Sequence, residues 1–356
     1  MVSFLCIIML ILYTPITTYA QEGDSKEIAL GRKVAEQVER TWERVTDPTI
    51  TARLNMILTH FRPHLDRDLP YEVRVIKDDE IPNAFSLPGG IVYFTTGMIQ
   101  LAESDSELAG VMAHELAHTE KKHVMIQVAR NQRLSLLSLG IIVATGGQAA
   151  AVLLTNVAQV AIMNSYSRDL EEEADMVGLD LLIKAGYPPS AMITLLERLA
   201  EEELKRPYFE PGIYQSHPKL KDRVAYLKST IMAKGLALNR KEVLGLLRVE
   251  VTEEDNFCLL AIDEEVILKL KSNPDTVAVL TNMAAGLNKA LKLELEPYEV
   301  KIINVGEESF FCVGPDRIIS QKDLPAGAPS LEEIRDKILL ALEKARQKHT
   351  FTNFIR

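Results

Sequence analysis

The segment Gly110–His123, with the sequence GVMAHELAHTEKKH, places two histidines four residues apart with a glutamate directly after the first. Apolar residues recur around it at helical spacing and no proline interrupts it, so it predicts a helix. A helix brings residues i and i+4 onto one face, so His114 and His118 can share one metal ion. Glu115 lies about 100° further round the helix, beside the open coordination position. This H-E-x-x-H pattern is typical of zinc sites; the alternative is an amphipathic helix with two surface histidines.

A third ligand is expected because catalytic zinc normally keeps three protein ligands. Downstream, the sequence SRDLEEEAD again places two acidic residues, Glu171 and Asp175, four positions apart. This spacing suits Glu171 as a metal ligand and Asp175 as the acceptor of the spare N–H of a ligating histidine. The alternative interpretation is that the acidic run is a solvated helix face.

Together, the two segments resemble the zinc peptidases of the HtpX and BepA type, which are gluzincins of peptidase family M forty-eight. The resemblance extends over about Glu27–Gly235. It implies a mostly helical, zincin-like peptidase domain with a small sheet. It also implies one Zn2+ per chain, held by His114, His118 and Glu171, and peptide hydrolysis with Glu115 as the general base.

A third segment, Asn83–Gly90 followed by Ile91–Thr96, looks like the family's NAF-x-LPGG turn and the strand before the H-E-x-x-H helix. In the family this strand lies along the active-site cleft, which implies substrate binding by strand addition to an exposed edge. A buried core strand is the alternative. The residues predicted to bind substrate are Gly90, Ile91, Val92, Tyr93 and Phe94.

A fourth segment, Ser216-His217-Pro218 with Arg223, looks like the family's (S/T)HPxxxxR element at the start of a helix. The resemblance places His217 near the zinc, where it can stabilise an oxyanion or, in a latent state, occupy the open metal position. The alternative is a His-Pro pair that merely starts a helix. Arg223 is expected to form a structural ion pair beside the site. His123 lies five residues after His118 on the same predicted helix, so we interpret it as a packing or surface residue.

The amino terminus indicates an extracytoplasmic, periplasmic or secreted protein. Residues 1–20 carry no charged side chain and run through an apolar stretch to Thr18-Tyr19-Ala20, which is typical of a cleaved signal peptide. The usual Lys or Arg before the apolar stretch is missing.

Without this leader, Cys258 and Cys312 are the only cysteines. One disulfide between them and two buried free thiols are both open.

A second apolar stretch, residues 134–163, lies between the two predicted metal-binding helices and is broken by glycines and polar residues. Each half is too short to cross a bilayer. We expect a helical hairpin at or over the cleft. A plain core hairpin, a lid and a membrane-contacting surface are the interpretations left open, and with the last of them membrane association.

Length and composition predict a two-domain α+β protein. The chain of 356 residues exceeds what one core usually serves, and alternating strands after Gly235–Arg240 predict a separate α+β domain over residues 241–356 behind a peptidase domain over 21–235. A net charge of -10 argues against nucleic-acid partners. The second domain shows no chemical motif and no repeat.

The predicted function is zinc-dependent endopeptidase activity on extended or misfolded proteins and peptides, with a place in envelope protein quality control by family analogy. The alternative is a latent or non-catalytic client-binding or assembly factor whose zinc is capped. The sequence leaves substrate preference and oligomeric state open.

Overall fold

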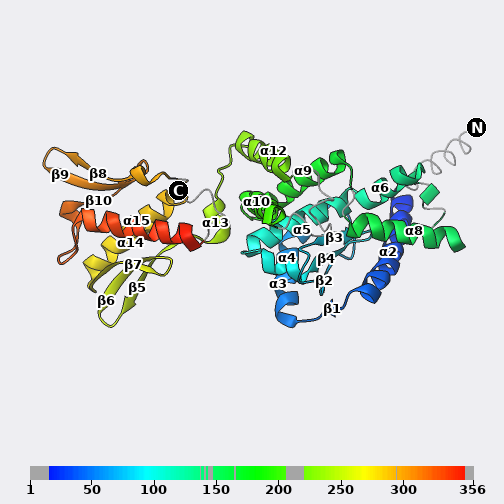
Figure 1. Ribbon diagram of the computed structural model, residues 1–356, viewed down its shortest axis with the longest axis horizontal. Helices are drawn as coiled ribbons and strands as arrows, with labels where there is room; N and C mark the ends of the chain where they lie inside the picture. Colours follow the sequence, from blue (N-terminus) through cyan, green and yellow to red (C-terminus); the bar gives the residue numbers. More distant parts are fainter. Residues whose placement is uncertain are drawn as a thin grey trace, which may run out of the picture. The chain divides into compact units, whose positions relative to one another are not determined.

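The computed structural model describes residues 16–136, 138, 139, 142, 147–163, 166–205, 220–293 and 295–348. The chain divides into two compact units, Met1–Leu236 and Ala237–Arg356. Most of the predicted signal peptide, residues 1–15, lies outside the described residues, and the first described helix begins at Ile16, before the predicted cleavage site. Figure 1 shows the elements of each unit.

Unit 1 is mostly helical, with one small sheet. Its helices are α2 (Ile16–Thr41), α3 (Pro48–Phe61), α4 (Thr96–Leu101), α5 (Asp105–Glu120), α6 (His123–Gln132), α8 (Gly147–Ile162), α9 (Arg168–Lys184), α10 (Ser190–Lys205) and α12 (Leu220–Ala233). Its strands are β1 (Arg44–Val45), β2 (Glu72–Ile76), β3 (Ala84–Leu87) and β4 (Ile91–Thr95). This content confirms the prediction of a mostly helical domain with a small sheet.

The sheet of unit 1 has the strand order β1-β2-β4-β3. Strand β4 pairs in parallel with β2 and antiparallel with β3, and all of its residues are buried. The expectation that Gly90–Phe94 forms an exposed edge is therefore wrong. Both backbone edges of β4 are already hydrogen-bonded, and the buried core strand is the correct alternative. The sheet edge on this side is β3.

Helix α5 begins at Asp105 and packs tightly against α9. The Ser104 hydroxyl accepts a hydrogen bond from the Glu107 backbone N–H at 3.2 Å, which caps the helix. Helix α9 crosses α5 at Gly178, where an added Cβ would lie 3.1 Å from the Ala113 carbonyl oxygen and 3.2 Å from the His114 Cα. The missing side chain therefore lets the two helices that carry the site approach closely.

The predicted single helix through His118 and His123 is wrong, because α5 ends at Glu120 and α6 begins at His123. Lys122 between them adopts the left-handed conformation, with φ of 56°. A left-handed residue cannot continue a right-handed helix. The break redirects His123, which is fully buried.

Helix α8 packs its inner face against β3, α2 and α6. Leu153, Val157 and Val160 are buried there, whereas Val152 on the outer face is 59% exposed. No helix among the described residues is long and apolar enough to cross a membrane. The second half of the predicted hairpin is therefore a helix that covers β3 on one face and exposes Val152 beside the polar Thr155 and Gln159 on the other.

Unit 2 is a separate α+β fold, as predicted, and contains the same succession of elements twice. Three antiparallel strands lead to a helix in each half, and both halves share one core. The elements are α13 (Arg240–Leu244), β5 (Val249–Glu254), β6 (Phe257–Ile262), β7 (Glu265–Lys271), α14 (Pro274–Ala290), β8 (Val300–Val305), β9 (Glu308–Val313), β10 (Asp316–Ser320) and α15 (Leu331–Lys348). The sequence did not reveal this repeat.

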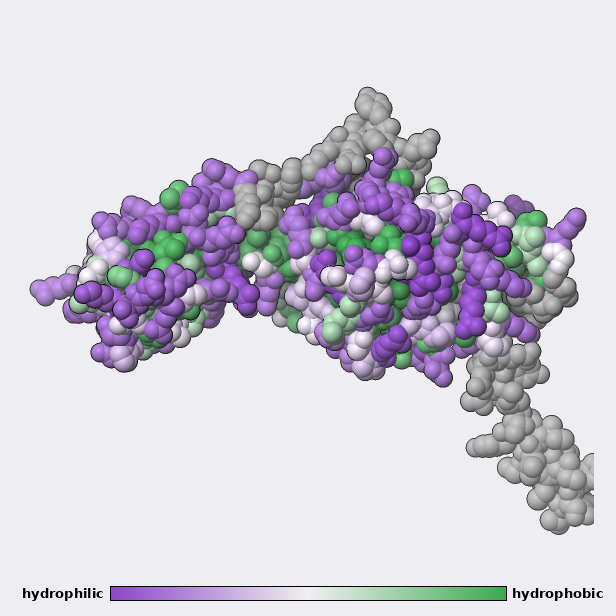
Figure 2. Space-filling model, turned by 90° about the horizontal axis from the view of Figure 1, so that it is seen from below, coloured by the Kyte–Doolittle hydropathy of each residue, from purple (hydrophilic) through white to green (hydrophobic). Residues whose placement is uncertain are grey.

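The two cysteines of unit 2 are buried and free. Cys258 belongs to β6 and Cys312 to β9, which are the middle strands of two different sheets. The disulfide is therefore not formed, and two buried thiols are the alternative that the structure contains. Figure 2 shows that hydrophilic residues cover most of the visible surface of each unit, as expected for a chain with a quarter of its residues charged.

Candidate metal centre

Two histidines of α5 and one glutamate of α9 meet in the interior of unit 1. His114 Nε2 lies 3.0 Å from His118 Nε2. The Glu171 carboxylate lies 3.6 Å from His114 Nε2 and 3.5 Å from His118 Nε2. All three residues are buried, and each offers a ligand atom within 4.8 Å of the others. The structure thus brings together the three residues that the sequence predicts as metal ligands.

These distances fit a small tetrahedral cation. Two ligand atoms that each lie about 2.1 Å from a tetrahedral Zn2+ are about 3.4 Å apart, close to the three separations of 3.0, 3.5 and 3.6 Å. The charges fit as well. Among the described residues, three carboxylates are buried around the histidines, those of Glu115, Glu171 and Asp175, against one guanidinium, that of Arg223. A divalent cation would balance the remaining negative charge.

Asp175 holds the outer nitrogen of His114. His114 Nδ1 lies 3.0 Å from Asp175 Oδ1, so an N–H at that nitrogen donates to the carboxylate. Nε2 is then the unprotonated nitrogen, as metal binding requires. Burial alone would lower the pKa of His114, but the hydrogen bond to Asp175 raises it above its usual value. Arg223 donates two hydrogen bonds to the same carboxylate, from Nη2 at 2.6 Å and from Nε at 2.8 Å. Tyr226 donates its hydroxyl to Asp175 as well.

His118 has its own outer partner, which sequence reasoning missed. His118 Nδ1 lies 3.0 Å from His123 Nδ1, and His123 Nε2 lies 3.4 Å from Glu173 Oε2. With Nε2 of His118 facing the metal position, its Nδ1 carries the proton and donates to His123. The second nitrogen of His123 then donates to Glu173. The helix break at Lys122 creates this contact, and the sequence carried no recognisable signal for it.

Glu115 lies beside the three donor residues with only 2% of its surface exposed. Its Oε2 atom is buried without a hydrogen-bond partner among the described residues. Burial raises the pKa of Glu115 to about 7, and the nearby negative charge of Glu171 adds to this effect. A carboxyl group whose pKa lies near neutral pH can take up and release a proton. The ring of Tyr166 stacks on His118 at 4.1 Å and closes this side of the site.

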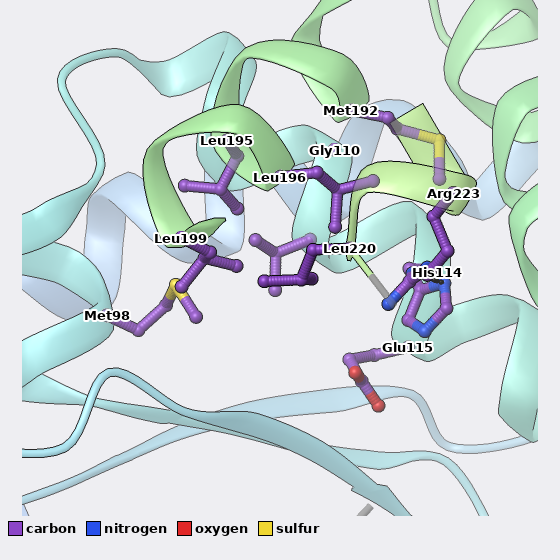
Figure 3. A pocket seen from close by; sticks show the side chains of 11 residues that line it. Met98, Gly110, His114, Glu115, Met192, Leu195, Leu196, Leu199, Leu220 and Arg223 are labelled. Carbon is purple, nitrogen blue, oxygen red and sulfur yellow. Dashed lines mark hydrogen bonds between the residues drawn. The ribbon is translucent and has the colours of Figure 1, made fainter. Parts of the chain in front are cut away.

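An apolar pocket opens beside Glu115 and His114 (Figure 3). It holds about 460 Å³ of empty space, part of it open to solvent. Figure 3 shows leucines of α10 gathered around Leu220, with His114 and Glu115 to one side. Its apolar lining includes Met98, Met192, Leu195, Leu196, Leu199 and Leu220.

Six of the remaining predicted residues are placed differently from the sequence interpretation or lie outside the described residues. Residues Gly90–Phe94 belong to the central part of the sheet, as described above. His217 lies outside the described residues. Arg223 takes part in the expected ion pair, through Asp175 and, at 3.4 Å, Glu171.

A helix with H-E-x-x-H, a second helix that supplies a carboxylate, and a small sheet beside them define a zincin-type metallopeptidase. Residues 48–231 match the profile of Peptidase family M48. The chain belongs to this family, which confirms the resemblance seen in the sequence.

Several curated proteins are similar to the chain over the same region. The beta-barrel assembly-enhancing protease of Escherichia coli K12 is 29% identical over 211 residues, which cover 56% of this chain and 42% of that protein. The putative beta-barrel assembly-enhancing protease of Vibrio cholerae is 34% identical over 167 residues, 45% of this chain and 34% of that protein. The mitochondrial metalloendopeptidase OMA1 of Schizosaccharomyces pombe is 33% identical over 165 residues, 44% and 45% of the two chains. The chain thus spans less than half the length of these relatives.

Proposed function

We propose that the chain is a zinc-dependent endopeptidase that cuts extended or misfolded proteins. The observation that carries this proposal is the convergence of His114, His118 and Glu171 at tetrahedral spacing with Glu115 beside them. The three residues would hold the ion. A bound zinc ion supplies Lewis acidity, which polarises a peptide carbonyl and makes a water molecule more acidic.

The residues of the chain account for the remaining steps. Glu115, with its pKa raised by burial to about 7, accepts a proton from the attacking water and then passes it to the leaving amine. Asp175 and His123 keep the rings of His114 and His118 in the orientation that presents Nε2 to the ion. Arg223 neutralises Asp175 and keeps it ionised.

The position of the sheet supports an extended substrate. Strand β3 is the edge strand, it contacts α5, and Ser86 on it lies near enough to Glu115 to lower the pKa of that carboxyl. A peptide paired with β3 rather than β4 would run past Glu115. The amino-terminal apolar stretch supports an extracytoplasmic location. By analogy with relatives named for beta-barrel assembly, the protein would act in envelope protein quality control.

The burial of the whole site favours a second candidate, a latent or client-binding protein. His114 is 7% exposed, His118 and Glu171 are each 1% exposed, and every residue of β3 is buried. A site this enclosed admits a peptide only after part of the chain moves.

His217 is proposed to act at this site, either on the oxyanion or as a cap on the metal. The outer face of α8, where Val152 is 59% exposed beside polar residues, is proposed to contact the membrane surface.

A paired assay tests the proposal. Wild type and Glu115→Gln are compared for zinc content and for cleavage of casein. The matched control is Glu172→Gln, which makes the same chemical change at an exposed position of α9. We expect zinc in all three proteins and cleavage by wild type and the control only. Zinc in all three without cleavage by any of them would favour the latent or client-binding protein, and a protein that binds no zinc would contradict both.

A further inference from the structure

Unit 2 repeats one succession of elements, so its two halves offer equivalent strands that can be compared. Strand β5 begins the first three-stranded sheet and β8 begins the second, and each is an edge strand of its sheet. The opposite edges, β7 and β10, each contain one residue that shifts the register, Ile267 and Ile318. Bulges of this kind twist an edge strand and hinder pairing with a further strand. The regular edges of these two sheets are therefore β5 and β8.

The backbone of β8 is open to a further strand over a short stretch. The Gly314 N–H donates to the Glu299 carbonyl oxygen at 3.0 Å. In an antiparallel pair, successive residues alternate between bonding to the neighbouring strand and facing away from it. Ile303 therefore bonds to β9, whereas Ile302 and Asn304 direct their N–H and C=O groups away from β9. Ile303 and Asn304 are exposed and Ile302 is half-buried, so an added strand can reach these groups.

Strand β8 also lacks the charges that usually protect an edge strand. Its sequence VKIINV carries one charged side chain, Lys301. Ile303 is 37% exposed, Val305 is 51% exposed, and Tyr298 just before the strand is 75% exposed. The equivalent strand β5 has the sequence VEVTEE, with three glutamates. Of the two equivalent edges, β8 is thus the apolar one.

A second copy of the same strand fits the open stretch of β8. Antiparallel pairing about Ile303 brings Ile302 of each copy opposite Asn304 of the other. These are the residues whose backbone groups face away from β9, so the pairing satisfies the free groups of both copies. The exposed side chains of the two Ile303 residues then meet at the two-fold axis and leave water.

The charges permit this self-pairing in β8 and oppose it in β5. In β8, Lys301 would lie opposite Val305 of the second copy. Glu308 of the second copy would follow one strand further on, about 10 Å away on the same face, because Glu308 pairs with Val305 across the β8–β9 hairpin. The same pairing of β5, about the equivalent position, would place Glu250 opposite Glu254 of the second copy. Like charges directly opposite each other destabilise a strand pair.

We infer that two copies of the chain associate through β8, so that two three-stranded sheets become one continuous sheet across a two-fold axis. A contact between identical surfaces closes on itself, which limits the assembly to two copies. The contact uses unit 2 alone and leaves the residues of the metal centre untouched.

Sedimentation velocity of the full chain over a series of micromolar concentrations tests this inference. Wild type is compared with Ile303→Lys, which places two like charges opposite each other at the axis. The matched control is Thr252→Lys, which introduces lysine at the equivalent exposed position of β5. Circular dichroism checks that each variant is folded. We expect a dimer with wild type and control, and a dissociation constant roughly 10- to 100-fold higher with Ile303→Lys.

Oxidative cross-linking tests the register of the two strands. The two Ile303 residues would form a non-hydrogen-bonded pair with Cβ atoms about 5 Å apart, so Ile303→Cys should form a disulfide between the copies under mild oxidation. Thr252→Cys should form none, and the native cysteines are buried. None of these measurements depends on peptidase activity.

Three results would overturn the inference. The first is a wild type that stays monomeric at every concentration. The second is a dimer that Ile303→Lys does not weaken, and the third is a dimer that Ile303→Cys does not cross-link. Reduced, carboxymethylated lactalbumin serves as a probe for a different occupant of β8. A monomeric wild type that binds this unfolded protein, with binding lost in Ile303→Lys, would replace the second copy by an extended client chain.

Discussion

Replacement of His123 by leucine removes the hydrogen-bond acceptor of a predicted metal ligand without removing the ligand. His118 Nδ1 and His123 Nδ1 are 3.0 Å apart, and both residues are buried. In His123→Leu the buried N–H of His118 loses this hydrogen bond. A buried donor left without an acceptor costs about 1–3 kcal/mol. Since about 1.4 kcal/mol corresponds to a factor of ten, we expect zinc to bind roughly 10- to 100-fold more weakly.

The matched variant is His123→Asn. The side-chain oxygen of asparagine stands where Nδ1 of histidine stands, so it can accept the same hydrogen bond although it no longer reaches Glu173. Zinc affinity is measured by competition with a chromophoric chelator, and folding is checked by circular dichroism. We expect His123→Asn to bind zinc nearly as tightly as wild type. If folded His123→Leu binds zinc as tightly as wild type, or if both variants weaken equally, the orienting role of His123 is refuted.

Three further predictions follow from the packing and the charges. Gly178→Ala should push α9 away from α5 and lower the free energy of unfolding, measured by urea titration, by about 1–3 kcal/mol. The control is Gly286→Ala in α14, where the atom nearest to the new Cβ belongs to a flexible side chain. This control should leave the free energy of unfolding unchanged or raise it. Burial alone would raise the pKa of Asp175, but Arg223 holds it far below its usual value of 3.8. In metal-free protein the stability of wild type over Asp175→Asn should therefore be complete above about pH 4 and decline as the pH falls further; a difference that stays constant down to pH 2 would contradict this. Finally, Cys258 and Cys312 should resist thiol reagents in the native protein and react after denaturation; a disulfide in the purified protein would refute this.

Local sequence patterns predicted those features of the structure that depend on residues close together in the sequence. The H-E-x-x-H helix and the meeting of Glu171 with the two histidines depend on i, i+4 spacing and on one helix crossing. The fold class and the family followed from the same segments, which lie within residues 48–231 that match the family.

The sequence did not predict the features that depend on the conformation of a single residue or on strand order. One left-handed residue, Lys122, turns His123 back toward His118, and no residue type at that position indicates it. The strand order of the sheet depends on pairing between segments that are far apart in the sequence. The apolar pattern of β4 is therefore equally compatible with an edge strand and with a central strand. The repeated order of elements in unit 2 stayed hidden because the two halves share a pattern of elements rather than a pattern of residues.

The central claim is that His114, His118 and Glu171 hold a zinc ion beside Glu115. Zinc analysis combined with X-ray absorption at the zinc edge of the purified protein tests it most directly. The account predicts one zinc per chain with two imidazole ligands and the remaining ligands oxygen, at about 2.0–2.2 Å. A protein that retains no zinc, or a spectrum with a sulfur ligand from Cys258 or Cys312, would contradict it.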